Sequence, residues 1–155
     1  MDFSEAERRL EITYKEVGAK LWKALVAFTG DRETASDAVA EAFAQALARE
    51  SAIREPDRWV WRVAFRVAAG ELKDRHRRGT TVEERSYEMP EGAILLSGIL
   101  QRLSPKQRGA IVLHYYVDMP TAEIGRVLGM SPATVRVHLS KGRQRLKALL
   151  EDSDA

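Results

Sequence analysis

Apolar residues recur at every third or fourth position along most of the 155-residue chain. This spacing places them on one face of an α-helix, and capping serines, first-turn prolines and terminal glycines mark several helix ends. Together these signals predict helices over residues 4–28, 31–49, 56–78, 94–103, 105–117, 122–128 and 132–149. The pattern therefore predicts an all-α fold.

The last two predicted helices are joined by a tight turn. Gly129 and Met130 form the joint. Ser131 is a good N-cap, and Pro132 suits the first helical position. The inward stripe of the second helix has spacings of four, three and four: Val135, Leu139, Gly142 and Leu146. Residues 131–147 hold five Lys or Arg and no Asp or Glu, so the other face is cationic. Such a helix suits the major groove of DNA.

A surface helix whose basic face is only solvated is the alternative interpretation, because such helices are common. The conjunction of several features favours DNA binding. A Glu-Ile pair precedes Gly129, and the motif Ser131-Pro132-x-Thr134-Val135-Arg136 follows it. Apolar residues on both arms have the spacing needed to clamp the two helices together.

The predicted helix over residues 56–78 interleaves aromatic residues with arginines. The interleaved residues are Arg58, Trp59, Trp61, Arg62, Phe65 and Arg66. Side chains of these two kinds can stack on and cradle unpaired bases. Burial is the competing interpretation for the apolar members, and we expect at least one tryptophan to lie in the core.

The composition favours an intracellular protein with packed cores. Hydrophobic residues make up 45% of the chain, which supports packed cores. The net charge is only +2, so a basic surface must come from local clustering. The absence of cysteine excludes disulfides and thiolate metal sites. No apolar run approaches the length of a membrane span, and the N-terminus lacks the order of a signal peptide. We therefore expect a soluble, cytoplasmic protein without membrane insertion.

The sequence shows little that is typical of an enzyme. Its histidines lie in separate predicted elements without carboxylates at ligand spacing: His76, His114 and His138. No glycine-rich loop suited to cradling phosphates is present. We therefore predict a binding protein that has no catalytic residue, no cofactor and no metal.

Residues 79–90 are polar, have no clear apolar period and are predicted to lie in a linker. The predicted organisation is a first domain over residues 1–78, a linker over 79–92 and a second domain over 93–155. Few contacts are expected between domains joined in this way. Residues 79–98 carry a net charge of −3 and residues 99–155 a net charge of +4, so the basic surplus is concentrated in the second domain.

The C-terminal half resembles region four of the sigma-70 superfamily. The matching stretches are Leu103 to Arg108, Ile111 to Tyr116, Ala122-Glu123-Ile124, Leu128-Gly129, Ser131 to Arg136 and Arg143-x-Arg145-Leu146. The N-terminal half looks like region two of the same family, through Thr29-Gly30-Asp31, Asp37 to Phe43 and Trp59 to Ala64. These two regions alone are the architecture of the extracytoplasmic-function (group IV) sigma factors. The resemblance implies two small helical domains, a region-two bundle and a region-four helix-turn-helix, joined by a short linker.

The resemblance also implies a function in transcription initiation, with RNA polymerase core, promoter DNA and an anti-sigma factor as partners. The residues implied to dock on the beta-prime clamp helices of core are Asp37, Glu41, Phe43 and Gln45, while region four meets the beta flap. The minus-ten promoter element would be melted and read by Arg58, Trp59, Trp61, Arg62, Phe65 and Arg66. In the minus-thirty-five element, bases would face Arg136, Val137 and Ser140, and phosphates would be held by Thr134, His138, Lys141 and Arg143.

Two residues depart from the family pattern. Ala40 stands where the family often has Gln, and Arg66 stands where it usually has Asn. An asparagine can read the edge of a flipped base, and an arginine would read it differently, so the minus-ten preference is expected to differ. In the second domain, Arg136 is the implied base reader with bidentate reach to guanine.

Two alternatives to a sigma factor remain open. A stand-alone helix-turn-helix regulator would share the pattern from Thr134 to Leu139, and would bind duplex DNA as a dimer without core polymerase. A sigma-like adaptor would bind core without opening promoters, and Arg66 in place of Asn keeps that alternative open.

Overall fold

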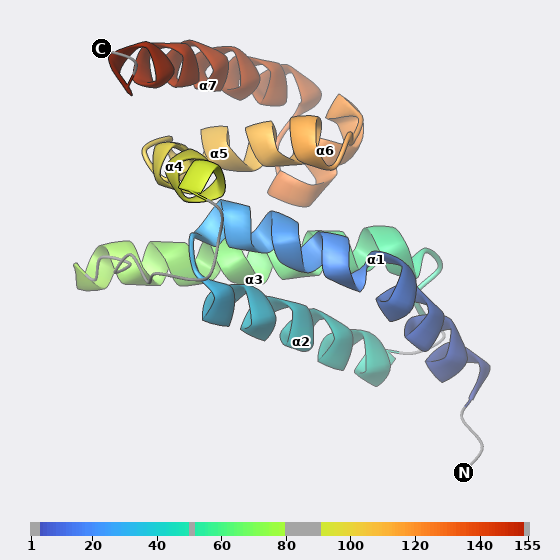
Figure 1. Ribbon diagram of the computed structural model, residues 1–155. Coiled ribbons are helices and arrows are strands. Elements are labelled where there is room, and N and C mark those ends of the chain that lie inside the picture. Colours follow the sequence, from blue (N-terminus) through green and yellow to red (C-terminus); the bar gives the residue numbers. More distant parts are fainter. Residues whose placement is uncertain (1–3, 50–51, 80–90, 154–155) are drawn as a thin grey trace.

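The computed structural model describes residues 4–49, 52–79 and 91–153, and these residues form helices and connecting turns but no strand. In chain order the elements are α1 Glu5–Thr29, α2 Arg32–Arg49, α3 Pro56–Arg78, α4 Glu91–Leu100, α5 Pro105–Ile111, the π-helical turn η2 Val112–Tyr116, α6 Thr121–Leu128 and α7 Pro132–Ser153 (Figure 1). The predicted all-α fold class is confirmed. Most of the predicted linker, residues 80–90, lies outside the described residues.

Several helix ends follow local chemistry that the sequence displays. Ser4 caps α1 with its side-chain oxygen, and Gly30 ends that helix with a φ of 73°. Asp31 accepts hydrogen bonds from two backbone N–H groups in the first turn of α2. Ser104 and Gln107 form a capping box at the start of α5. These contacts satisfy backbone groups that have no partner inside a helix, and so they fix where each helix begins.

Helices α1, α2 and α3 form a bundle with large core residues on α1 and α3 and small ones on α2. The rings of Phe28 and Phe65 are buried, with centroids 5.0 Å apart. The buried alanines of α2 are Ala35, Ala38, Ala42 and Ala46. Because these side chains end at Cβ, α2 can approach both neighbours closely while the interior stays densely packed.

The C-terminal half packs α5, η2, α6 and α7 together. Leu113, Ile124 and Val135 are fully buried at its centre. Gly142 of α7 lies against α5, where an added Cβ would approach the Cγ1 atom of Ile111 to 2.9 Å. A glycine at this position therefore sets the close approach of α7 to α5.

The two halves are in contact, contrary to the expectation that few contacts would join them. Figure 1 shows α4, α5 and α6 lying along α1 and α3, on the side opposite α2. The side chain of Gln101 donates a hydrogen bond to the Ala27 carbonyl oxygen at 3.0 Å. An added Cβ on Gly109 would approach both Leu128 and Phe28. The buried residues of both halves form one continuous core, because apolar faces of α1 and α3 remain to be covered after α2 has packed.

None of the described helices is both long and apolar enough to cross a membrane.

Candidate nucleic-acid interface

The turn between α6 and α7 depends on two glycines and a capped helix start. Gly129 ends α6 with a φ of 71°, and the N–H of Met130 donates to the Gly125 carbonyl oxygen at 2.9 Å. A Cβ on Gly125 would approach the Met130 carbonyl oxygen to 2.5 Å, so this position needs a glycine. The Ser131 hydroxyl accepts a hydrogen bond from the Thr134 N–H at 3.2 Å and caps α7. The direction in which α7 leaves the turn is thereby fixed.

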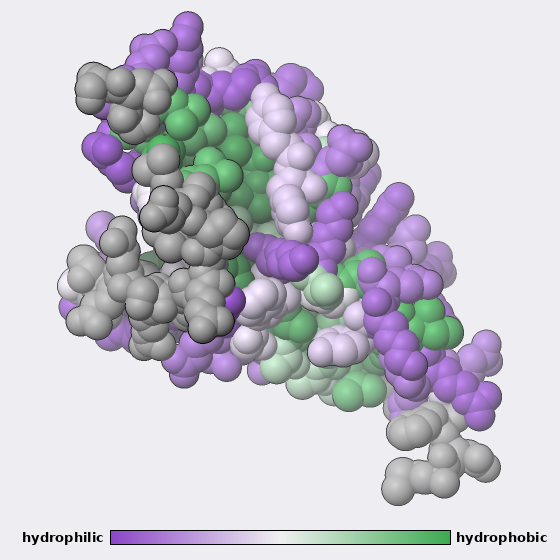
Figure 2. All heavy atoms as spheres, in the orientation of Figure 1, coloured by the Kyte–Doolittle hydropathy of each residue, from purple (hydrophilic) through white to green (hydrophobic). Residues whose placement is uncertain are grey.

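Helix α7 buries Val135 and Leu139 and leaves the opposite face in solvent. The exposed members of the predicted minus-thirty-five set are Thr134, Arg136, Val137, Ser140, Lys141 and Arg143, and His138 is half-buried. Figure 1 places α7 on the outer side of the molecule, away from α2, and Figure 2 shows hydrophilic side chains along that edge. The structure thus places this predicted set on one accessible helix, and its contacts with DNA stay a prediction.

His138 lies in a cationic setting. Burial lowers the pKa of His138, and the positive charges of Lys106 and Lys141 lower it further. Lys106 is on α5 and Lys141 is on α7, so positive charge reaches this imidazole from two helices. An anion bound here would relieve the repulsion, which suits this part of the face to a phosphate group.

On α3, the predicted minus-ten residues fall into an exposed and a buried group. Arg58 and Arg66 are exposed, and Arg62, which lies four residues from each, is half-buried. These arginines share one side of α3 because residues four apart in an α-helix are neighbours. The Nε atom of Arg62 is buried and has no hydrogen-bond partner among the described residues. The side of α3 that remains open therefore carries a row of arginines, of which Arg58 is paired with Glu55 at 3.2 Å.

The aromatic residues of α3 are partly or fully covered. Trp61 is 7% exposed and Phe65 is 1% exposed, and their ring centroids lie 6.0 Å apart in a stacked pair. Trp59 is half-buried beneath the guanidinium of Arg49, 5.7 Å from the ring centroid. The expectation of at least one core tryptophan is met by Trp61. Stacking of Trp61 or Phe65 on a base stays a prediction, and it would require these rings to leave the core.

The predicted polymerase-binding residues of α2 lie on two flanks of its buried stripe. Asp37 and Glu41 are exposed, and Gln45 is half-buried and donates a hydrogen bond to the Glu41 carboxylate at 2.9 Å. Phe43 is half-buried and makes an edge-to-face contact with Tyr14 of α1, with centroids 5.3 Å apart. By helical periodicity Phe43 therefore faces away from the three polar residues. The structure brings the polar residues together and separates Phe43 from them.

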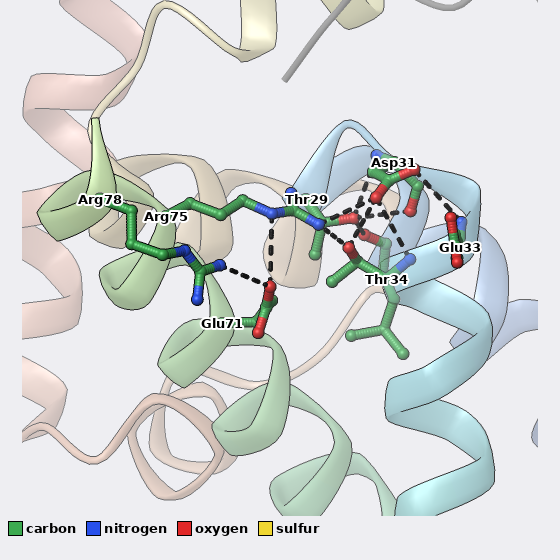
Figure 3. A network of polar contacts seen from close by, with 8 residues as sticks. Thr29, Asp31, Glu33, Thr34, Glu71, Arg75 and Arg78 are labelled. Atoms are coloured by element: carbon green, nitrogen blue, oxygen red, sulfur yellow. Dashed lines mark hydrogen bonds and ion pairs between the residues drawn. The ribbon is translucent and has the colours of Figure 1, made fainter. Parts of the chain in front are cut away.

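A polar network joins the start of α2 to the end of α3 (Figure 3). Arg75 contacts the Asp31 carboxylate at 2.9 Å and also the hydroxyl of Thr34. Burial raises the pKa of Asp31, but hydrogen bonds from the Thr34 hydroxyl and two backbone N–H groups, with the charge of Arg75, outweigh it and hold that pKa below its ordinary value. Glu71 lies within ion-pair distance of both Arg75 and Arg78. The network holds the helix with the Asp37 face against the helix with the arginine row.

Comparisons with known proteins cover both halves of the chain. Residues 94–146 match the family described as Sigma-70, region 4. The ECF RNA polymerase sigma factor SigL of Mycobacterium tuberculosis is 26% identical over 154 residues, which cover 90% of this chain and 87% of SigL. Residues 94–146 are a sigma-70 region 4, and the chain is similar to extracytoplasmic-function sigma factors along nearly its whole length.

Other proteins are similar to part of the chain in sequence, or to most of it in fold. The RNA polymerase sigma-E factor of Streptomyces avermitilis is 41% identical over 69 residues, 44% of this chain and 38% of that protein. The chain spans less than half the length of that relative and of other curated relatives that it matches. The sigma factor RpoE of Bartonella quintana, solved with the anti-sigma factor NepR, shares the fold. Its TM-score is 0.78 at 18% identity, over 94% of this chain and 96% of RpoE.

The sequence alone missed two residues of the region-four half. Arg108, within the matched motif Leu103 to Arg108, is 4% exposed rather than on the surface. Tyr115 is four residues after the buried Ile111 in the same predicted helix, yet it is 57% exposed. In a regular α-helix, a residue four positions after the buried Ile111 would lie on the same buried face. Here the helix widens into the π-helical turn η2 instead.

Proposed function

We propose that this chain is an RNA polymerase sigma factor that binds core polymerase and directs promoter recognition and transcription initiation. The observation that carries the proposal is the exposed cationic face of α7 within the part of the chain that matches sigma-70 region 4. Arg136 on this face has the donor geometry for the O6 and N7 atoms of guanine, and its hydroxyl- and amine-bearing neighbours suit phosphates. Those neighbours are Thr134 and Lys141.

The polymerase-binding part of the proposal rests on α2. Asp37 and Glu41 offer exposed carboxylates to a cationic partner surface such as the beta-prime clamp helices. An exposed ion pair contributes under about 1 kcal/mol, so apolar contacts must supply most of the affinity. Phe43 and the exposed Tyr14 offer such contacts on the other flank of the helix. Core polymerase would therefore have to contact both flanks of α2.

Promoter opening in this proposal is driven by binding energy and not by a catalytic group. Separating DNA strands costs roughly 1.4 kcal/mol per base-pair step, and stacking one base on an aromatic side chain returns about 1–3 kcal/mol. A few captured bases cannot open a whole bubble, so core polymerase must share the work. We infer that the protein acts in the cytoplasm, where core polymerase and promoters are, under the control of an anti-sigma factor that covers its binding faces.

A sigma-like adaptor that binds core without opening promoters is the second candidate. The burial of Trp61 and Phe65 favours it, because the rings that would capture unpaired bases are packed in the core. Arg66 in place of the family's usual asparagine points the same way. The two candidates share the α2 surface and differ only in what α3 does to DNA.

Permanganate footprinting with and without bacterial core polymerase separates these candidates. The template is the DNA upstream of the chain's own gene, and complex formation with core is measured in parallel. For a sigma factor we expect thymines that react only when both core and this protein are present. Arg66→Ala should lower that reactivity, while Arg8→Ala, which alters an exposed arginine of α1, should leave it unchanged.

The other outcomes each select a different function. Core binding without reactive thymines would establish the adaptor. Tight duplex binding by the protein alone, without core binding, would overturn the sigma assignment in favour of a stand-alone regulator.

A further inference from the structure

A hydrogen bond joins the π-helical turn η2 to the DNA-facing helix α7. The Nη1 atom of Arg143 donates to the hydroxyl oxygen of Tyr115 at 3.1 Å. The two residues are 28 positions apart and both are exposed. This contact therefore brings a side chain from outside the helix-turn-helix to the edge of its basic face.

The wide turn of η2 turns Tyr115 outward. Ile111 is buried, and in a regular α-helix the residue four positions later would share its face. The N–H of Val117 instead donates to the Val112 carbonyl oxygen five residues back, at 3.2 Å. The extra residue in this turn rotates Tyr115 out of the core, and single wide turns of this kind are frequent at functional sites.

The ring of Tyr115 is braced on the other side by the edge-to-face contact with His114, whose centroid lies 4.6 Å away. A tyrosine has only two side-chain torsions, so this contact and the bond to Arg143 hold its hydroxyl at low entropic cost. Tyr115 is thus a rigid support for a long and otherwise mobile arginine.

Tyr115 and Arg143 both keep hydrogen-bond donors that this contact does not use, and these donors suit an anion. The Tyr115 oxygen accepts from Arg143, which leaves its own O–H free to donate. Arg143 keeps its remaining N–H donors, and it makes no ion pair with any carboxylate whose placement the structure describes. A cationic fork and a phenolic O–H side by side match the oxygens of a single phosphate group.

The position of Arg143 on α7 selects the DNA backbone over the bases. Arg143 lies between the buried Leu139 and the outward Arg136 on the helical wheel, so it is at one flank of the exposed face. When a helix lies in the major groove, its centre meets base edges and its flanks meet phosphates. Lys141 and His138 lie on the opposite flank, so the two flanks can contact the two phosphate backbones.

We infer that Tyr115 positions Arg143 through its hydroxyl group, and that the two side chains together bind one phosphate of the promoter duplex. This inference rests on the proposed function, since it requires α7 to bind DNA. It adds a DNA-binding element, η2, that lies before the helix-turn-helix in the chain.

The experiment compares Tyr115→Phe with Tyr116→Phe in the full chain. Tyr116 is the matched control because it is the next residue, is also exposed, and its side chain makes no hydrogen bond to any residue that the structure describes. The probe is a duplex selected by the wild-type protein from a pool with randomised positions, and affinity is measured by fluorescence anisotropy over a salt series. The melting temperature of each variant confirms that the fold is intact.

We expect Tyr115→Phe to weaken duplex binding about fivefold, the size of one lost hydrogen bond, and Tyr116→Phe to leave binding unchanged. Arg143→Ala should lower the slope of log affinity against log salt by roughly 0.9, as one phosphate contact is lost. Tyr115→Phe should shift that slope in the same direction. In the Arg143→Ala background its effect should be smaller than in the wild-type protein, a non-additivity that a purely structural role would not produce.

The possible failures are distinguishable. If the wild-type protein selects no duplex, the proposed function fails and this inference with it. If the wild-type protein binds but Tyr115→Phe matches it, or the two variants act additively, the positioning role of Tyr115 is overturned while the proposed function stands.

Discussion

The guanidinium of Arg108 is buried against the main chain of α1, where its Nε atom donates a 2.5 Å hydrogen bond to the Phe28 carbonyl oxygen. Its Nη1 atom donates to the Leu103 carbonyl oxygen at 2.9 Å, and its guanidinium lies 5.6 Å from the centroid of the Phe28 ring. Burial lowers the pKa of Arg108 to about 10, and no described carboxylate forms an ion pair with it. One arginine thus joins the two halves of the chain through backbone oxygens.

Arg108→Ala should lower the free energy of unfolding by about 2–3 kcal/mol, because two buried carbonyl oxygens lose a charged donor. Arg108→Met keeps much of the aliphatic volume and should lose the hydrogen-bond part alone. Arg102→Ala, at an exposed position nearby, should change stability by less than about 0.5 kcal/mol. The measurement is urea unfolding followed by circular dichroism. An Arg108→Ala protein as stable as the Arg102→Ala control would contradict the role of this contact.

The helices were predictable from sequence because their signals are local. Apolar spacing and the caps at Ser4, Ser104 and Ser131 depend only on neighbouring residues. Arg108 could not be placed in this way, since its partner Phe28 is 80 residues away in the chain. The sequence shows the motif that contains Arg108, but a motif does not identify the carbonyl oxygens that its arginine will contact in the fold.

The candidate site was predictable to a similar extent. The exposed face of α7 follows from the apolar spacing within that single helix, so the sequence predicts that its residues lie together. The burial of Trp61 and Phe65 depends on how α3 packs against α1 and on which helix covers its other side. The exposure of Tyr115 does not follow from an apolar period of 3.6 residues per turn, because η2 breaks that period.

The Asp31 network predicts a specific response to acid. The folded-state pKa of Asp31 is lowered, so its stabilising contribution is present above the ordinary pKa and is lost as the pH falls through the folded-state value. Asp31→Asn should therefore lower stability at neutral pH and flatten its decline below about pH 4. Thermal unfolding over a pH series tests this. A variant whose acid decline is as steep as in the wild-type protein would show that other carboxylates dominate.

Two glycine-to-alanine changes should have opposite effects. Gly125→Ala should disrupt the α6–α7 turn, because the new Cβ would lie 2.5 Å from the Met130 carbonyl oxygen, and backbone atoms cannot give way cheaply. Gly70→Ala on α3 meets nothing within 4 Å and removes a flexible residue from a helix, so it should stabilise by about 0.5–1 kcal/mol. Melting temperatures of the two variants test the pair. A Gly125→Ala protein with unchanged stability and duplex binding would contradict the tight turn.

The setting of His138 predicts that duplex binding tightens as the solution becomes more acidic. The pKa of His138 is lowered by burial and then by Lys106 and Lys141, so the imidazole is mostly neutral near pH 7 in the free protein. A phosphate bound beside it would favour the protonated form, so DNA binding and proton uptake are linked, and lower pH favours both.

Duplex affinity measured by fluorescence anisotropy should therefore rise between about pH 8 and pH 6, by less than about a hundredfold, which is the limit for uptake of one proton over two pH units. His138→Gln should remove most of this dependence, because glutamine keeps a hydrogen-bond donor but cannot gain charge. His76→Gln, at an exposed position on α3, is the matched control and should retain it. A wild-type affinity that does not change with pH would place the nearest phosphate away from His138, and would leave Lys141 as the cation that holds the backbone on this flank of α7.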